Sequence, residues 1–255
     1  MRDRLQSSSI RTRRSSGRAR AGHGTETWNI DRAVDELKRV AEKRNIEGMA
    51  RFGIRAKNVL GVSKPKLDEL ARNIGRNHTL ALQLWKTGIH DARILAGMIA
   101  EKDRVTAQLM DSWMRHFDSW DICDGTCCHL FVFAGPAWPK AFAWSGRKKE
   151  FEKRAGFALA AYLAIHDKAA PNGVFQKYLK VIEREAEDAR NFVRKAVNWA
   201  LRNIGKRNVK LNREAIRVAD RLRKRGSRTA GWIATDALRE LRSDAVQRRL
   251  QRKHA

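Results

Sequence analysis

The chain has 255 residues and carries 54 Lys and Arg residues against 28 Asp and Glu residues, a formal net charge of +26. This positive excess is larger than solubility requires and indicates a polyanionic partner, of which nucleic acid is the usual one. No stretch approaches the roughly twenty apolar residues of a membrane span, and the N-terminus lacks the apolar segment of a secretory signal, so the sequence predicts neither membrane insertion nor export.

Residues 1–24 are rich in Arg, Ser and Gly, with seven arginines against a single acid, Asp3. Such a composition cannot form a core, so we expect a disordered basic arm. It either trails along phosphate groups or results from a start codon placed too early. Both interpretations remain open.

Helical spacing of apolar residues begins near Trp28 and continues to the end of the chain, with no convincing alternating strand. Asn29 or Asp31, Ser63 followed by Pro65, and Asn77 are typical helix starts, while Gly75 and Gly88 are typical ends. A further helix is expected over residues 91–100. These short helices, separated by short polar turns, predict an all-α fold.

Residues 119–129 concentrate an aromatic residue, two acids and all three cysteines. If the segment is helical, Trp120 and Asp124 are four positions apart and share a face, with Asp121 rotated away. A carboxylate beside an indole ring suits a cationic ligand. The alternative is that Trp120 lies in the core and both acids face water at a helix start.

The cysteines lie at positions 123, 127 and 128, with no distant partner. A disulfide framework is therefore not expected, and a reducing cytoplasm is the natural compartment. The spacing before His129 could suggest zinc, but a structural zinc site usually needs a second, separated ligand pair. We expect small buried thiols, no metal and no cofactor.

Three segments resemble one another, at residues 92–96, 153–158 and 193–200, and each has an arginine at the head of an apolar, small-residue helix. Arg154 and Arg194 are 40 residues apart, a spacing typical of paired-helix repeats, which predicts an α-solenoid of HEAT-like repeats. The interval from Arg93 to Arg154 is longer and indicates a degenerate repeat or an insertion. Residues 134–149, rich in Gly and Pro, are expected to be irregular.

The C-terminal third contains a helix that opens at Asn172 and is expected to end in a solvated acidic stretch, residues 183–188. The chain becomes basic again beyond Trp199, and one last helix over residues 229–252 is expected to cap the solenoid. We therefore divide the chain into a basic arm (1–24), a repeat domain (25–228) and a capping helix with a basic tail (229–255).

Four motifs, in order, resemble the DNA alkylation repair family of AlkD-type glycosylases: GIHDARILA (88–96), SWDICD (119–124), KRA (153–155) and VRKAVNWALR (193–202). The resemblance spans about residues 28–208. It implies that Asp124 is the catalytic acid, that Trp120 and Trp199 are the site aromatics, and that Arg154 is the catalytic-site arginine. The residues themselves also allow other roles: Asp124 could cap a helix starting near Gly125, Trp199 could be core, and Arg154 could pair with Glu150.

The implied activity is a monofunctional DNA glycosylase that hydrolyses the N-glycosidic bond of positively charged N-alkylated purines, of the 3-methyladenine and 7-methylguanine type, without deep base flipping. A nearby carboxylate would stabilise the positive charge that moves onto the deoxyribose as the bond breaks. The expected partner is double-stranded DNA, bound by a monomer. The residues expected to contact DNA are basic: Arg154, Arg194, Lys195, Arg202, Lys206 and Arg207.

Two other functions remain compatible with the sequence. The first is a basic solenoid that binds damaged or branched DNA without chemistry. The second is a HEAT-type protein scaffold, which explains the helices but not the charge of +26.

Overall fold

The computed structural model describes residues 27–54 and 56–252, so the basic arm expected at residues 1–24 lies outside the described residues. Within these ranges the chain forms helices and no strand, which confirms the all-α prediction. The α-helices are α1 (Ile30–Arg39), α2 (Lys43–Arg51), α3 (Lys64–Ile74), α4 (His78–Lys86), α5 (His90–Ile99), α6 (Ala107–Met114), α7 (Trp120–His129), α8 (Ala137–Ser145), α9 (Glu150–His166), α10 (Asn172–Glu185), α11 (Asn191–Gly205), α12 (Val209–Arg223), α13 (Arg228–Leu241) and α14 (Asp244–Arg252). Two short 3-10 helices, η1 (Lys102–Arg104) and η2 (Phe131–Phe133), complete the description.

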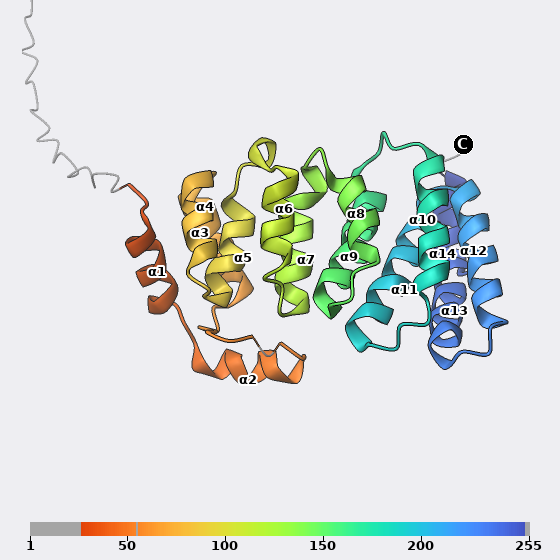
Figure 1. Ribbon diagram of the computed structural model, residues 1–255, viewed down its shortest axis with the longest axis horizontal. Helices are drawn as coiled ribbons and strands as arrows, with labels where there is room; N and C mark the ends of the chain where they lie inside the picture. The colour runs from red at the N-terminus through yellow and green to blue at the C-terminus, as the bar shows by residue number, and fades with distance from the viewer. Residues whose placement is uncertain (1–26, 55, 253–255) are drawn as a thin grey trace, which may run out of the picture.

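The helices stack side by side along one axis, with the N-terminal helices at one end and the C-terminal helices at the other (Figure 1). The odd-numbered helices α5, α7, α9, α11 and α13 contact one another in sequence and form one layer. The even-numbered helices α4, α8, α10 and α12 each pack against the odd-numbered helix that follows them. This two-layer repetition confirms the predicted solenoid.

The long interval between Arg93 and Arg154, for which the sequence allowed a degenerate repeat or an insertion, contains the additional helices α6 and α7. The prediction that residues 134–149 are irregular was wrong over most of its length, because α8 occupies residues 137–145. Pro139 stands at the third position of that helix. A helix tolerates proline there, since the first turn has no use for the missing N–H.

Local signals place several helix ends as expected. The Asn29 side chain accepts a hydrogen bond from the Arg32 N–H at the start of α1, and Asn77 does the same for the Leu80 N–H in α4. Gly75 ends α3 with φ of 72°, a backbone conformation that glycine adopts without strain. Chain-local hydrogen bonds therefore fix these boundaries.

The C-terminal helix predicted over residues 229–252 is instead two helices, α13 and α14. Ser243 stands between them: its hydroxyl donates to the Glu240 carbonyl at the end of α13 and accepts a hydrogen bond from the Val246 N–H in α14. A serine that bonds neighbouring backbone groups offers an alternative to the helical ladder, which explains the break.

The sequence suggested that the acidic stretch 183–188 is a solvated helix end, and this prediction was wrong. Lys153 of α9 is buried and binds both Glu185, at 2.6 Å, and Asp188, at 2.9 Å. Burial opposes ionisation of Asp188, but hydrogen bonds from Arg190 and Lys153 outweigh it and lower its pKa. The acids therefore tie the α10–α11 connection to α9.

The central helix of the stack is α9, in which twelve of seventeen residues are buried. Its small residues allow α8 to approach closely: a β-carbon at Gly156 would lie 2.4 Å from the backbone nitrogen of Ser145. The Tyr178 hydroxyl of α10 closes this contact by donating to the Gly156 carbonyl at 2.8 Å. Residue size at position 156 thus sets the spacing of the layers around the start of α9.

Candidate functional site

Helix α7 begins at Trp120, so Asp124 lies inside the helix and does not cap one starting at Gly125. The other acid of this segment, Asp121, stabilises the start of α7. One Asp121 oxygen accepts hydrogen bonds from the Ser119 hydroxyl, at 2.6 Å, and the Ile122 N–H, at 2.9 Å, while the other lies 2.8 Å from Nε2 of His90 in α5. Asp121 therefore orients α7, which leaves Asp124 available for another role.

The His90–Asp121 pair is expected to make stability depend on pH. Burial disfavours the charged form of His90, but Asp121 outweighs it and raises the pKa of His90, while the pKa of Asp121 is lowered despite its own burial. The stabilisation by His90 is thus complete below its unfolded pKa of about 6.5 and is lost as pH rises through the higher folded pKa.

We therefore expect the stability advantage of the parent protein over His90→Asn to shrink between pH 6 and pH 8, measured as urea midpoints. The comparison with the variant is needed because burial lowers the pKa of His78 and of His129, which gives a slope of opposite sign. A difference in midpoint that stays constant over this range would contradict the assignment.

Asp124 forms a bidentate ion pair with Arg154 of α9. Nε of Arg154 donates to Oδ1 of Asp124 at 2.9 Å and Nη2 donates to Oδ2 at 2.6 Å. The remaining nitrogen, Nη1, donates to the Phe192 carbonyl of α11 at 2.7 Å. Arg154 therefore does not pair with Glu150, the alternative that the sequence left open, and its guanidinium links three successive inner helices.

This ion pair is largely withdrawn from water, with side-chain exposures of 15% for Asp124 and 8% for Arg154. Burial raises the pKa of Asp124 even though Arg154 acts in the opposite direction. For Arg154, burial acts to lower the pKa, but Asp124 outweighs it and raises the value. A charge in such surroundings acts more strongly on a nearby ligand than it would in water.

Trp120 lies one turn before Asp124 and is half-buried, so it is not the fully enclosed core residue considered above. Its indole nitrogen donates to the carbonyl of Phe52, just after α2, at 3.0 Å. The next residue, Gly53, lies against the ring of Phe192, with φ of 80°. The chain between α2 and α3 thus reaches the starts of α7 and α11.

Trp199 is also half-buried and meets Tyr162 of α9 edge to face, with ring centroids 4.9 Å apart. The hydroxyl of Tyr162 in turn lies close to the thiol of Cys128, one turn of α7 beyond Asp124. Burial raises the pKa of Tyr162 well above its usual range. The structure therefore connects Trp199 to the Asp124 face of α7 through Tyr162, a residue that sequence reasoning missed.

Phe192 was also missed, although its carbonyl binds Arg154. For Tyr162 the sequence did contain a signal, namely its spacing: it follows Arg154 by about two helical turns on the same helix. Nothing comparable marks Phe192, because the atom that binds Arg154 is a backbone carbonyl, which any residue type would supply.

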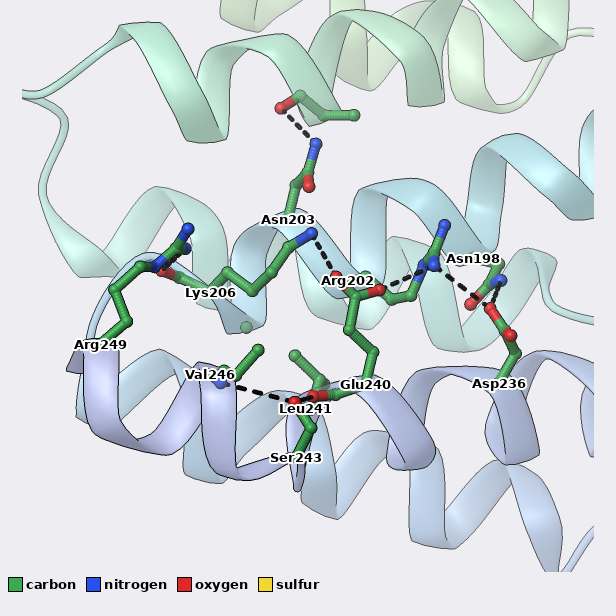
Figure 2. A network of polar contacts seen from close by, with 12 residues as sticks. Asn198, Arg202, Asn203, Lys206, Asp236, Glu240, Leu241, Ser243, Val246 and Arg249 are labelled. Carbon is green, nitrogen blue, oxygen red and sulfur yellow. Dashed lines mark hydrogen bonds and ion pairs between the residues drawn. The ribbon is translucent and has the colours of Figure 1, made fainter. Parts of the chain in front are cut away.

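The basic residues expected to contact DNA differ in how far acidic neighbours already neutralise their charges; Figure 2 shows two of them, Arg202 and Lys206, directed at Glu240. Arg202 binds Glu240 at 2.7 Å, and Lys206 binds the other oxygen of Glu240 at 2.6 Å. The guanidinium of Arg194 lies over the ring of Trp232, 5.0 Å from its centroid, and Lys195 is exposed. The positive charges of Arg194 and Lys195 are therefore less neutralised than those of Arg202 and Lys206, which pair with Glu240.

The family model described as DNA alkylation repair enzyme matches residues 33–241, most of the chain. The chain belongs to the DNA alkylation repair enzyme family. The family match includes every helix from α3 to α13, and so all of the residues described above from α7, α9 and α11.

Among solved structures, this member of the DNA alkylation repair enzyme family is similar to a protein described as belonging to "a new family of proteins related to the HEAT-like repeat DNA glycosylases with affinity for branched DNA structures". The TM-score is 0.72 at 19% identity, over 88% of this chain and 96% of that chain. A designed armadillo repeat protein is more distant, with a TM-score of 0.41 at 14% identity, over 84% of this chain and all of that one. No curated protein matches the chain.

The cysteines of this DNA alkylation repair family member are free thiols, with Cys123 and Cys127 buried and Cys128 half-buried. Over residues 27–54 and 56–252, no three His, Cys, Asp or Glu side chains gather as a metal site would require. In the same ranges, no helix combines the length and apolarity needed to cross a membrane.

Proposed function

We propose that this DNA alkylation repair family member is a monofunctional glycosylase that hydrolyses the N-glycosidic bond of positively charged N-alkylated purines. The observation that supports this function best is the Asp124 carboxylate, held in one orientation by Arg154 and flanked along α7 by Trp120. The positive charge of the whole chain is suited to the DNA backbone.

Alkylation at purine N3 or N7 makes the base a good leaving group, so the protein needs to supply little acid catalysis. Positive charge moves onto the deoxyribose as the bond breaks, and Asp124 stabilises it and orients the attacking water. Trp120 and Trp199 favour the cationic sugar or base through their ring faces. Lesions are processed in this scheme without deep base flipping.

Arg154 has a different role here from the phosphate contact expected of it in the sequence. Three of its nitrogens already donate within the protein. Arg154 is therefore a positioning residue for Asp124. We assign the nearest phosphate contacts to Arg194 and Lys195. Arg202 and Lys206 contribute less because they pair with Glu240, and Arg207 contributes less because it donates to backbone carbonyls.

The direct test is incubation with methylated duplex DNA, followed by heating in alkali to cut abasic sites and by chromatography of the released bases. We expect 3-methyladenine or 7-methylguanine in the supernatant together with strand breaks. Unmethylated DNA of the same sequence serves as the control. Methylated DNA that yields no free base would reject the glycosylase proposal.

A second candidate function is the binding of branched DNA without chemistry. Two observations favour it: both oxygens of Asp124 are already bonded to Arg154, and the similar solved structure is described as having affinity for branched DNA. This function predicts equal affinity for methylated and unmethylated DNA, preference for a forked DNA over a duplex, and no abasic product.

A further inference from the structure

A cavity of about 740 Å³ lies in the C-terminal half of the helix stack, and neither Asp124 nor Arg154 lines it. Its walls come from the end of α9, the α9–α10 connection, the first residue of α10, the end of α11 and the α11–α12 connection, with one residue from α14. Arg154 is near the start of α9 and Ala164 of the cavity is ten residues further along. At 1.5 Å per helical residue, the two sites are about 15 Å apart along α9.

The cavity has a strongly positive lining. Of the described residues that line it, none is acidic and four are basic: Lys168, Lys206, Arg207 and Arg249. Lys168 and Arg249 are exposed. Figure 2 shows Arg249 of α14 directed at the backbone of Lys206, whose carbonyl accepts a hydrogen bond from it at 3.2 Å. Among the residues that the structure describes, Lys206 is the only one of the four with an acid partner, Glu240.

The side chain of Arg207 is held in place beside the cavity by several contacts. Its guanidinium donates to the carbonyls of Ala164, Lys168 and Ala170 and lies over the ring of Phe175, 4.4 Å from the centroid. Burial lowers the pKa of Arg207, with only weak opposition from Asp167. The positive charge is thus held rigidly without a bound carboxylate, an arrangement that an anionic ligand would stabilise.

The rest of the lining is partly apolar and partly amide. Ile165 is 42% exposed, unusual for an isoleucine in this fold, and stands with Ala170 and Pro171 on one wall. Three asparagines also line the cavity, Asn172, Asn203 and Asn208. Asn208 donates to Asn172 at 2.8 Å and Asn203 donates to the Ala161 carbonyl at 3.3 Å, so a ligand would bond to their remaining amide atoms. Asn172 and Asn208 also stand at the starts of α10 and α12, where backbone N–H groups favour negative charge.

We propose that this cavity binds one unpaired nucleotide of a branched or frayed DNA strand. Its volume is in the range of about 300–1,000 Å³ typical of small-molecule sites. The basic residues take the phosphate, the apolar wall takes a face of the base, and the asparagines bond its edge. A base stacked in a duplex cannot enter a cavity, so the site selects unpaired strand.

The inference rests on DNA being the ligand of the proposed function, but it does not need base excision. Occupation of both sites would place a lesion at Asp124 while an unpaired nucleotide is held at the far ends of α9 and α11. The cavity therefore specifies which DNA structure is bound, and Asp124 specifies what is done to it.

The test compares a forked DNA carrying two unpaired arms with a blunt duplex of the same length, by fluorescence anisotropy at one fixed salt concentration. We expect Lys168→Gln/Arg249→Gln to lose at least tenfold in affinity for the fork and to bind the two DNAs nearly equally. Ile165→Glu, a change at a partly exposed residue, should have the same effect. Lys177→Gln/Lys224→Gln removes two exposed charges outside the cavity and should weaken both DNAs alike, leaving the ratio unchanged.

Two outcomes would overturn the inference: a parent protein with no preference for the fork, or cavity variants that keep the parent's preference. Excision of base from methylated blunt duplex is measured on the same samples. It tests the glycosylase proposal separately from the role of the cavity in binding forked DNA. Cavity variants should release base from that duplex at nearly the parent rate once DNA is saturating. Loss of excision in an Asp124 variant with the fork preference kept would leave the inference standing.

Discussion

Replacement of Asp124 by Asn is expected to slow base excision by at least about 100-fold, the scale of losing one preorganised group that stabilises transition-state charge. The amide keeps the shape of the side chain but cannot neutralise the cationic deoxyribose. Binding of DNA should change little, because Asp124 contributes no positive charge to the phosphate contacts. Single-turnover release of methylated base and DNA affinity measured on the same preparation check both expectations.

The fold must be controlled in this experiment, because Asp124→Asn leaves the buried guanidinium of Arg154 without its counter-charge. Breaking one partner of a buried ion pair costs about 3–5 kcal/mol of stability. The double variant Asp124→Asn/Arg154→Gln removes both charges and should recover much of that loss while staying inactive. A single or double variant that releases base as fast as the parent would show that Asp124 is structural.

Gly156→Ala is expected to destabilise the protein by about 3 kcal/mol or more, near the upper end of overpacking effects. The added methyl would lie 2.4 Å from the Ser145 nitrogen and 2.9 Å from the Ala141 carbonyl oxygen, both backbone atoms of α8. Backbone cannot turn aside as a flexible side chain can, so α8 must shift. Urea unfolding followed by circular dichroism gives the free energy of unfolding.

Gly231→Ala in α13 is the matched control, because a methyl added at this glycine would have nothing within 4 Å of it. There the change should stabilise the protein by about 0.5–1 kcal/mol, since alanine is the better helix former. Equal effects of the two substitutions would mean that α8 approaches α9 less closely than these distances require.

Much of the fold follows from short-range chemistry in the sequence. Asn29, Asn77 and Gly75 mark helix ends through bonds to residues three or four positions away, so the chain itself carries the information. The solenoid follows from the repetition of apolar helices. Residues 134–149 were predicted to be irregular because Gly and Pro were given more weight than the apolar spacing. Pro139 is in fact compatible with the first turn of a helix.

The site was predictable only in part. The spacing of Trp120 and Asp124 places them on one face, but the partner of Asp124 is thirty residues away on another helix. Proximity along the chain favoured Glu150 for Arg154, whereas helix packing brings Asp124 closer. The acids at residues 183–188 were misjudged for the same reason, since Lys153 reaches them from α9. Pairs between stacked repeats depend on helix orientation, which composition and periodicity do not encode.

The weak attachment of α2 has a consequence for access to the site. None of its nine residues is buried, and the aromatic residue that follows it, Phe52, is 75% exposed. Near the site, the hydrogen bond from Trp120 and the packing of Gly53 on Phe192 hold this segment. A single hydrogen bond is worth about 1 kcal/mol, so the segment after α2 is held to α7 much less strongly than a buried helix would be. The helix itself is also tied to the chain before α3, because Asn45 donates to the Gly61 carbonyl at 2.8 Å. In terms of the proposed function, displacement of Phe52 would free the indole N–H of Trp120, one helical turn from Asp124, to donate to a DNA ligand instead of to the protein backbone.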